Sequence, residues 1–205
     1  MKRLVEILKV PSVSLVVGKR GSGKTAFGTL LLEEAHEAGM KTYLLGLPKS
    51  KQHLLPEWIE LTDNIAHISD NSAIFMDESY IYAYARDYPK ELNKFMAKIV
   101  GVSRQKRWLL LFSSHTARKL DIGVVLDVDN LIVREPSWLH IRYERAELRE
   151  LIEKAAAYFS KCKEPVKYAY IYTEKGPIVA KLDLPSFWTE ELSLAFSGAG
   201  IEEIF

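Results

Sequence analysis

The eight residues from Gly18 to Thr25 constrain the fold of this chain more than any other segment. They read Gly-Lys-Arg-Gly-Ser-Gly-Lys-Thr, which is the complete G-x-x-x-x-G-K-[ST] pattern of a phosphate-binding loop, or P-loop. An apolar run at 12–17 precedes the loop, and an amphipathic stretch begins near Thr25. Because this pattern binds nucleotide when it joins a strand to a helix, we expect an α/β fold with the loop at the end of a buried strand.

Each part of the loop predicts a contact with a bound nucleotide. Glycine lets the backbone adopt positive φ and approach a polyphosphate closely, so that successive N–H groups face its oxygens. We expect Lys24 to reach the β and γ phosphates and the Thr25 hydroxyl to bind Mg²⁺. The predicted ligands are therefore ATP, or another nucleoside triphosphate, and Mg²⁺. The loop residues predicted to bind them are Gly18, Lys19, Arg20, Gly21, Ser22, Gly23, Lys24 and Thr25.

Composition favours one domain. The chain has 205 residues, of which 48% are hydrophobic, and we expect a single domain over 1–205 with one good core. No apolar run reaches the length of a membrane span, and charges occur throughout the first ten residues in place of the apolar region of a signal peptide. Cys162 is the only cysteine, so an intramolecular disulfide and a cysteine-based metal site are excluded. These features predict a soluble, intracellular protein, and the net charge of +1 argues against a basic coat for nucleic acid.

Strand and helix patterns alternate through a core at 12–134. Short, unalternating apolar runs are typical of parallel strands buried on both faces, and they lie at 12–17, 41–47, 72–76, 109–112 and 130–133. Apolar residues at three- and four-residue spacing predict helices at 25–38, 52–61 and 90–102. This order predicts a mostly parallel, doubly wound sheet flanked by helices, which binds its ligands at the carboxyl ends of the strands.

The last part of the chain, 135–205, has a different pattern. A long helix is predicted at 142–162, and two strand patterns at 166–173 and 177–184 flank a turn at 174–176 like a hairpin. A short helix at 189–196 follows. We interpret this part as a C-terminal helix and hairpin packed on the core and not as a separate domain.

Two carboxylates end the apolar strand at 72–76. Asp77 and Glu78 follow it directly, and a strand parallel to the P-loop strand would bring both to the same edge of the sheet. This arrangement resembles a Walker B element, in which Asp77 holds the Mg²⁺ shell and Glu78 orients the water that attacks the γ phosphate. The alternative is a solvated acidic turn after a core strand.

The next strand, 109–112, ends in Ser-Ser-His-Thr at 113–116. We expect these polar side chains to face the γ phosphate, because they occupy the same strand-end position as the other site elements. His115 would then donate a hydrogen bond to that phosphate or to the attacking water. A structural histidine with satisfied hydrogen bonds is the alternative.

The segment at 103–115, together with the P-loop and the Asp-Glu pair, resembles the FtsK/HerA superfamily of DNA-pumping ATPases. In that superfamily an arginine precedes the fourth strand, which ends in a polar Thr-Gln pair. The likeness covers 12 to about 134, and in its compact form the chain is most similar to genome-packaging ATPases of icosahedral viruses with internal membranes. Ser114 and His115 stand where the superfamily usually carries Thr and Gln, and 135–205 matches no motif of the family.

The resemblance implies a ring-shaped motor, a hexamer or pentamer, that hydrolyses ATP to translocate double-stranded DNA into a capsid. Arg104 would be an arginine finger that acts in the site of a neighbouring subunit, with Arg107 as the second candidate and an ordinary surface arginine as the alternative. The implied partners are DNA, further copies of the chain, and proteins of a capsid vertex, portal or membrane. The implied location is the host cytoplasm or the virion.

A local basic cluster follows the Walker B strand. Lys90, Lys94 and Lys98 share one face of the predicted helix at 90–102, so DNA phosphates are candidate partners and a solvated lysine face is the alternative. Four tyrosines before this helix are candidates for contact with nucleic acid, although packing or a subunit interface is the commoner role of such a stripe. They are Tyr80, Tyr82, Tyr84 and Tyr88.

Two other functions use the same loop. A P-loop kinase would transfer the phosphoryl group to a small acceptor, but Glu78 favours activation of water, and no arginine-rich lid is evident. An NTP-driven assembly or secretion ATPase would lack any role on DNA. The sequence carries no Asn-Lys-x-Asp guanine signature.

Overall fold

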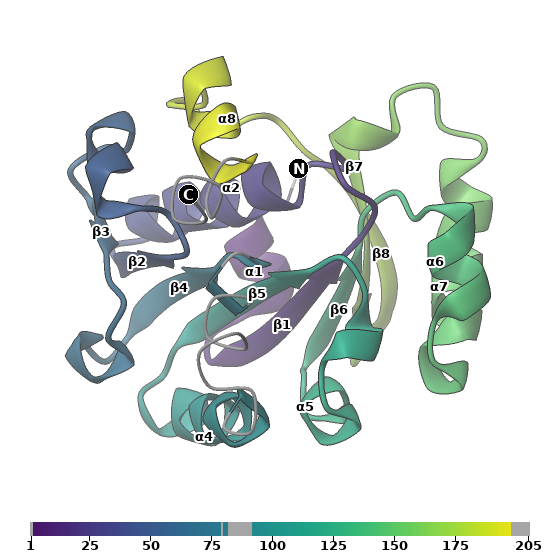
Figure 1. Cartoon of the computed structure of the whole chain (residues 1–205), viewed down its shortest axis with the longest axis horizontal. Helices are drawn as coiled ribbons and strands as arrows, with labels where there is room; N and C mark the ends of the chain where they lie inside the picture. Colours follow the sequence, from purple (N-terminus) through teal and green to yellow (C-terminus); the bar gives the residue numbers. More distant parts are fainter. Residues whose placement is uncertain (1, 79, 82–91, 198–205) are drawn as a thin grey trace, which may run out of the picture.

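The computed structural model describes residues 2–78, 80–81 and 92–197, which form an α/β sandwich around one eight-stranded sheet (Figure 1). The strand order is β3-β2-β4-β5-β1-β6-β7-β8. From β3 to β6 in this order all pairs are parallel, whereas β7 is antiparallel to β6 and to β8. The strands are β1 (Ser12–Val17), β2 (Lys41–Leu45), β3 (Ile59–Leu61), β4 (Ser72–Met76), β5 (Leu109–Ser114), β6 (Asn130–Val133), β7 (Tyr168–Thr173) and β8 (Gly176–Lys181).

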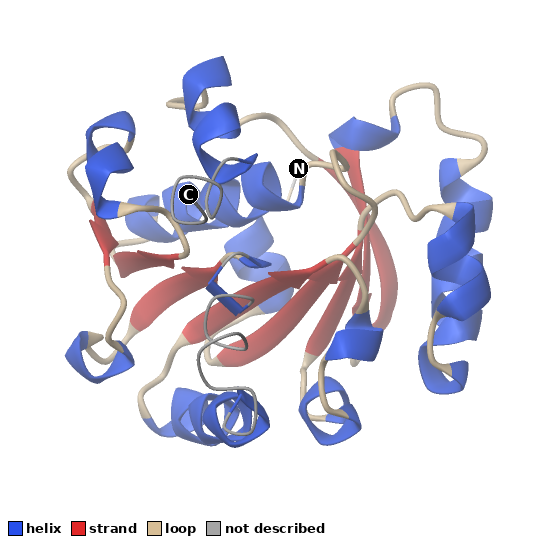
Figure 2. Ribbon diagram, in the orientation of Figure 1, coloured by secondary structure: helices blue, strands red, loops and turns tan. Residues whose placement is uncertain are grey.

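Helices cover both faces of the sheet (Figure 2). One layer consists of α1, α2 and α8, and the other contains α4, α5 and α7. The helices are α1 (Leu4–Leu8), α2 (Lys24–Glu37), α4 (Leu92–Gln105), α5 (Ile122–Leu126), α6 (Trp138–Tyr143), α7 (Ala146–Phe159) and α8 (Glu190–Ser197). Short 3₁₀ helices lie at Lys49–Leu54, Ile65–His67, Ala117–Lys119 and Pro165–Lys167.

The central strands are buried on both faces, which explains why their sequences do not alternate. In β1, Val13, Leu15 and Val17 pack in the α4 layer, and Val16 packs in the α2 layer. Parallel pairing of β1 with β5 and β6, and of β4 with β5, brings the carboxyl ends of four strands to one edge. The mostly parallel P-loop fold predicted from the sequence is confirmed.

Two predicted helices are wrong in their bounds. The helix expected at 52–61 is a 3₁₀ helix at Lys49–Leu54 followed by the edge strand β3, because Pro56 interrupts the pattern and disfavours helical backbone at the preceding residue. The helix expected at 142–162 is split into α6 and α7, with extended backbone at Glu144. The Glu144 side chain turns inward and is buried, so the chain cannot continue as one amphipathic helix.

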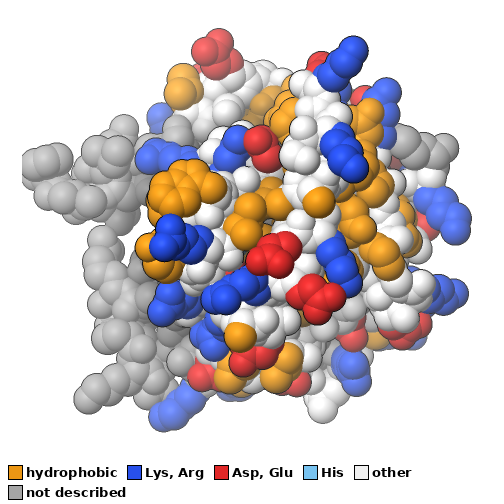
Figure 3. Space-filling view, turned by 90° about the vertical axis from the view of Figure 1, so that its right-hand side faces the viewer, with side chains coloured by type: hydrophobic (Ala, Val, Ile, Leu, Met, Phe, Trp, Pro, Cys, Tyr) orange, Lys and Arg blue, Asp and Glu red, His pale blue; other side chains and the backbone are white. Residues whose placement is uncertain are grey.

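The C-terminal hairpin is present and extends the sheet. A turn at Glu174 and Lys175 joins β7 to β8, and Gly176 follows with a φ of 103°. Figure 3 views the side of α6 and α7, where charged and hydrophobic side chains are interspersed. On α6, Trp138, Leu139 and Tyr143 are exposed. Among the described residues, no helix combines the length and apolar character needed to cross a bilayer.

Candidate nucleotide-binding site

The loop between β1 and α2 has a conformation that requires glycine. Gly21 and Gly23 have φ values of 75° and 84°, in the left-handed region. A Cβ atom at Gly18 would lie 2.7 Å from the Cβ of Arg134 and 2.7 Å from the Oγ of Ser22. Gly23 precedes the first turn of α2, so the positive end of the helix dipole lies at the loop. A side chain at any of these three glycines would strain or crowd the loop.

Lys24 reaches back over the loop. Its Nζ donates to the carbonyl oxygens of Gly18 at 3.0 Å and Lys19 at 3.3 Å, and lies 2.9 Å from Nδ1 of His115. Lys24 is only 7% exposed. Burial lowers the pKa of its ammonium, and the nearby carboxylates of Glu78 and Asp77 offset this in part. A buried ammonium whose direct partners are neutral groups is suited to bind an anion.

Side-chain oxygen atoms from three elements meet at the start of α2. Thr25 Oγ1, at the start of α2, donates to Asp77 Oδ1 at 3.2 Å, and Ser113 Oγ donates to the same oxygen at 3.3 Å. A hydroxyl and a carboxylate are hard ligands of the kind that Mg²⁺ prefers, so Thr25 and Asp77 fit the metal of a bound nucleotide. Within 2–78, 80–81 and 92–197, no cluster of three or more His, Cys, Asp or Glu side chains offers a metal site by itself.

Glu78 and His115 are joined by two hydrogen bonds. The His115 ring lies with Nε2 2.9 Å from Glu78 Oε2, and the His115 backbone N–H donates to Oε1 at 2.7 Å. Because the Lys24 ammonium can only donate, Nδ1 of His115 accepts and Nε2 carries the proton. Burial raises the pKa of Glu78, but the hydrogen bonds from His115 and the charge of Lys24 outweigh burial and hold the pKa below its ordinary value. Glu78 is therefore an ionised, buried carboxylate.

The structure thus brings together five side chains that the sequence singled out: Lys24, Thr25, Asp77, Glu78 and His115. Two further loop residues lie at the rim. The Nζ of Lys19 pairs with Glu135 at 2.6 Å, and Arg20 is exposed. The chemistry available at this edge is anion binding by a helix terminus and a buried ammonium, next to a carboxylate that can accept a proton.

Arg104 lies at the opposite edge of the sheet. It is near the end of α4, and β5 begins soon after it, at Leu109, whose partner in β1 is Ser12. The P-loop follows the other end of β1, about 16 Å away at 3.3 Å per residue. Arg104 is exposed, and its Nη2 pairs with Asp129 Oδ1 at 3.3 Å. Arg104 therefore does not reach the P-loop of its own chain.

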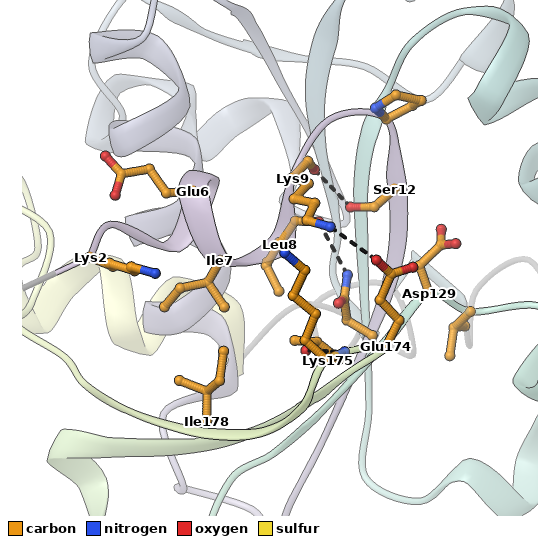
Figure 4. Close-up of a pocket in the computed structure, with 14 residues that line it drawn as sticks. Lys2, Glu6, Ile7, Leu8, Lys9, Ser12, Asp129, Glu174, Lys175 and Ile178 are labelled. Carbon is orange, nitrogen blue, oxygen red and sulfur yellow. Dashed lines mark hydrogen bonds and ion pairs between the residues drawn. The ribbon is translucent and has the colours of Figure 1, made fainter.

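Asp129 also lines a cavity of about 420 Å³ at this edge, between α1, the start of β1 and the β7–β8 turn (Figure 4). The walls carry charges of both signs, and Lys9 Nζ pairs with Glu174 Oε1 at 3.1 Å. None of the predicted nucleotide-binding residues lines this cavity.

The predicted DNA-contact residues are only partly described. Lys94 and Lys98 are exposed on α4, one turn apart, whereas Lys90 lies outside the described residues. Tyr80 packs inward, with its ring 6.3 Å from that of Phe95 and its hydroxyl donating to the Asp63 carbonyl at 3.1 Å. Tyr82, Tyr84 and Tyr88 also lie outside the described residues.

Sequence reasoning missed two buried charged residues next to the site. Arg134 follows β6 and packs against Gly18 and Gly23 of the P-loop. It ends a predicted strand, so the strand-end argument applied to Asp77 and His115 would have found it. Glu144 accepts hydrogen bonds from the segment directly after His115, but its position inside a predicted helix gave no signal.

Solved structures share this fold. No protein-family model and no curated protein matches the sequence. The genome packaging NTPase B204 from Sulfolobus turreted icosahedral virus 2, in complex with ATP-gammaS, matches with a TM-score of 0.56 and 13% identity over 84% of this chain and 98% of that chain. The DNA-packaging ATPase B204 from Sulfolobus turreted icosahedral virus matches with a TM-score of 0.58 and 11% identity over 85% and 98%.

A secretion ATPase matches as well. The cytoplasmic domain of the Type VII Secretion ATPase EccC from Thermomonospora curvata has a TM-score of 0.55 and 13% identity over 92% of this chain and 28% of that chain. This chain therefore shares its fold with these three ATPases. The likeness predicted from the residues at 12–134 is thereby confirmed at the level of the fold.

Proposed function

We propose that this protein is an ATP-hydrolysing motor that translocates double-stranded DNA, and that it packages a viral genome. The observation that carries the hydrolytic part is the position of Glu78. This buried, ionised carboxylate is held by His115, which also contacts the P-loop lysine Lys24. A carboxylate so placed serves water activation, which distinguishes an ATPase from a protein that only binds nucleotide.

Each residue of the site has its own role in the proposed hydrolysis of ATP. The P-loop N–H groups and Lys24 bind the phosphates, and Glu78 orients the attacking water and accepts its proton. His115 connects the phosphate-binding cation to this carboxylate, so it responds to the state of the γ phosphate. Thr25 and Asp77 would hold Mg²⁺, which would supply charge neutralisation at the terminal phosphates.

The motor part of the proposal rests on the shared fold and on two features of this chain. Arg104 is remote from its own P-loop, as a finger acting in a neighbouring subunit of a ring would be. Lys94 and Lys98 are exposed lysines one turn apart on α4, a spacing that suits contact with phosphates of a DNA backbone. The solved packaging ATPases with this fold support DNA as the cargo.

A secretion or assembly ATPase is the second candidate. The match to the secretion ATPase EccC has a TM-score of 0.55, close to the 0.56 of the B204 complex with ATP-gammaS, so the fold favours neither cargo. The two candidates share the hydrolytic site and differ only in whether DNA is the substrate of movement.

The test is steady-state ATP hydrolysis with Mg²⁺, measured across protein concentration with and without long duplex DNA. We expect DNA to stimulate hydrolysis and DNA binding to weaken steeply with salt, since phosphate contacts release counterions. Glu78→Gln should bind ATP and lose hydrolysis by at least about 100-fold. Glu150→Gln, which alters an exposed carboxylate paired with Lys154 on α7, is the matched control.

Each contrary outcome has a separate meaning. If Glu78→Gln loses hydrolysis but DNA does not change the rate of the wild type, the secretion or assembly ATPase is favoured over the DNA motor. ATP consumption that requires a small hydroxyl or phosphate acceptor would replace both with a kinase. Equal rates of hydrolysis in Glu78→Gln and wild type would show that Glu78 takes no part in the reaction.

A further inference from the structure

Arg134 lies behind the P-loop, at the end of β6. Arg134 is 2% exposed, and its side chain is among the largest of those fully buried in the described residues. Nε donates to the carbonyl oxygen of Ser22 at 2.9 Å, and Nη2 donates to the carbonyl oxygen of Val166. Burial lowers the pKa of Arg134 to about 10, so the guanidinium is still protonated at neutral pH. The contacts connect the P-loop to the segment that precedes the C-terminal hairpin.

The bond to Ser22 fixes the orientation of one P-loop peptide. In a planar trans peptide the C=O and N–H point in opposite directions, so a Ser22 carbonyl held against Arg134 directs the Gly23 N–H away from it. Gly23 has a φ of 84° and no Cβ, so the residue itself restricts this peptide little. A donor behind the loop therefore helps to hold the N–H on the side where phosphates bind.

Close packing reinforces the same arrangement. A Cβ at Gly23 would lie 2.8 Å from Nη2 of Arg134, and the backbone N–H of Arg134 donates to the Val17 carbonyl at 2.8 Å. Nη1 of Arg134 is buried without a hydrogen-bond partner in the described part of the chain. Burial of a guanidinium with one unpaired nitrogen costs free energy. The two hydrogen bonds that the side chain does form are both to backbone carbonyl oxygens.

We infer that Arg134 is a positioning residue of the nucleotide site, which locks the Ser22–Gly23 peptide with its N–H toward the bound phosphates. The inference rests on the proposed nucleotide binding and adds a residue that the P-loop pattern does not contain. It also gives the C-terminal part of the chain a role in the site, because Val166 holds the other arm of the guanidinium. P-loop N–H groups cradle the α and β phosphates, so ADP and pyrophosphate are sufficient probes.

The test is calorimetric titration of the full chain with ADP and with inorganic pyrophosphate, in the presence of Mg²⁺. Arg134→Lys keeps the charge, but a single ammonium cannot reproduce the fork that serves both carbonyls, and Arg134→Met removes charge and fork. We expect both variants to bind both ligands roughly 10- to 100-fold more weakly, which is the usual cost of a lost charge-assisted hydrogen bond. Lys154→Met, on the exposed face of α7, is the control for loss of one positive charge.

A spectroscopic readout separates positioning from general destabilisation. Labelling serine with ¹³C at the carbonyl and glycine with ¹⁵N selects the Ser-Gly peptides, of which the sequence has two, at 22–23 and 197–198. In wild type, pyrophosphate should shift the 22–23 amide signal downfield. In folded Arg134→Lys the unliganded 22–23 signal should already differ from wild type, and its response to pyrophosphate should shrink.

If both variants bind both ligands within twofold of wild type and the 22–23 signal is unchanged, the inference about Arg134 is overturned. The proposed nucleotide function is then unaffected. Wild-type protein that binds neither ligand would overturn the proposed nucleotide function and this inference with it. If Arg134→Met does not fold, Arg134→Lys decides, because it keeps a cation in the buried position.

Discussion

His115 illustrates how a single residue connects two charged groups. Its ring accepts a hydrogen bond from the Lys24 ammonium on one nitrogen and donates to the Glu78 carboxylate from the other. Glutamine, the residue expected here from the sequence resemblance to the FtsK/HerA superfamily, also has an acceptor and a donor at the end of its side chain. A glutamine at 115 could therefore make the same two hydrogen bonds.

This equivalence predicts the behaviour of two variants. His115→Gln should keep the turnover number for ATP within about tenfold of wild type, whereas His115→Ala should lose roughly 10- to 100-fold, because Glu78 loses a charge-assisted hydrogen bond. The measurement is hydrolysis at saturating ATP, with ATP binding measured separately to show that both variants retain the site. Equal losses in the two variants would mean that the imidazole itself is required.

Thr25 and Thr29 lie one turn apart on α2 and differ in their contacts. Thr25 Oγ1 donates to Asp77, whereas Thr29 Oγ1 donates to the carbonyls of Thr25 and Ala26 within the helix. Thr25→Ala should raise the Mg²⁺ concentration for half-maximal hydrolysis by about tenfold or more, since it removes a metal-binding oxygen. Thr29→Ala is the matched control and should leave this concentration unchanged. A Mg²⁺ dependence that Thr25→Ala does not alter would contradict the assignment of the metal site.

At the scale of elements, one buried cluster attaches the segment after β5 to α6. Glu144 Oε2 lies 2.8 Å from His140 Nε2 and accepts from Thr116 Oγ1 at 3.0 Å and the Ala117 N–H at 3.3 Å. The side chains of Glu144 and His140 are almost fully buried. Because Thr116 follows His115 directly, this cluster fixes the position from which His115 enters the site.

The cluster predicts how stability depends on pH. Burial raises the pKa of Glu144, but hydrogen bonds from His140, the Arg145 N–H and Thr116 outweigh burial and hold the pKa below its ordinary value of 4.5. A carboxyl whose pKa is lower in the folded state stabilises the fold above its unfolded pKa, and this contribution is lost as the pH falls through the folded value. The loss in wild type should therefore occur below pH 4.5.

Chemical unfolding at several pH values measures this contribution. At pH 7, Glu144→Ala should lower the free energy of unfolding by about 3 kcal/mol, because it leaves His140 buried without its partner. Glu144→Gln should show a smaller fall in stability below pH 4.5 than wild type. Glu150→Gln, an exposed change on α7, controls for the loss of a carboxylate. An unfolding free energy that varies with pH identically in wild type and Glu144→Gln would contradict the prediction.

The sequence predicted the elements that local patterns determine. Apolar runs at 12–17 and 72–76 are strands, and the P-loop between 12–17 and α2 follows from its glycines. The break at Glu144 was not predictable, because it depends on the burial of this side chain against Thr116, a contact between distant segments. The strand-end position of Arg134 is visible in the sequence, but its inferred role requires the pairing of β6 with β1, which the sequence alone does not specify.

At the scale of the whole molecule, the nucleotide site and Arg104 lie at opposite edges of the sheet. In a ring, such an arrangement allows the Arg104 edge of one subunit to face the P-loop edge of the next. In the single chain Asp129 holds Arg104 at 3.3 Å, and Asp129 is itself fixed by the Val13 N–H, which donates to its other oxygen at 2.8 Å. In the single chain Arg104 therefore pairs with a carboxylate of its own subunit.

A finger that acts between subunits predicts recovery of activity in mixtures. Arg104→Ala should lose hydrolysis by about 10³-fold or more, and Glu78→Gln should lose it through its own site. Mixed subunits should regain part of the activity, because a Glu78→Gln subunit supplies Arg104 to the intact site of an Arg104→Ala neighbour. Arg107, whose Nε donates to Asn71 Oδ1 at the same edge, is the second candidate, and Arg107→Ala tests it in parallel. Wild-type turnover that is independent of protein concentration, together with mixtures no more active than their parts, would show that each subunit hydrolyses ATP alone and that Arg104 has no partner site.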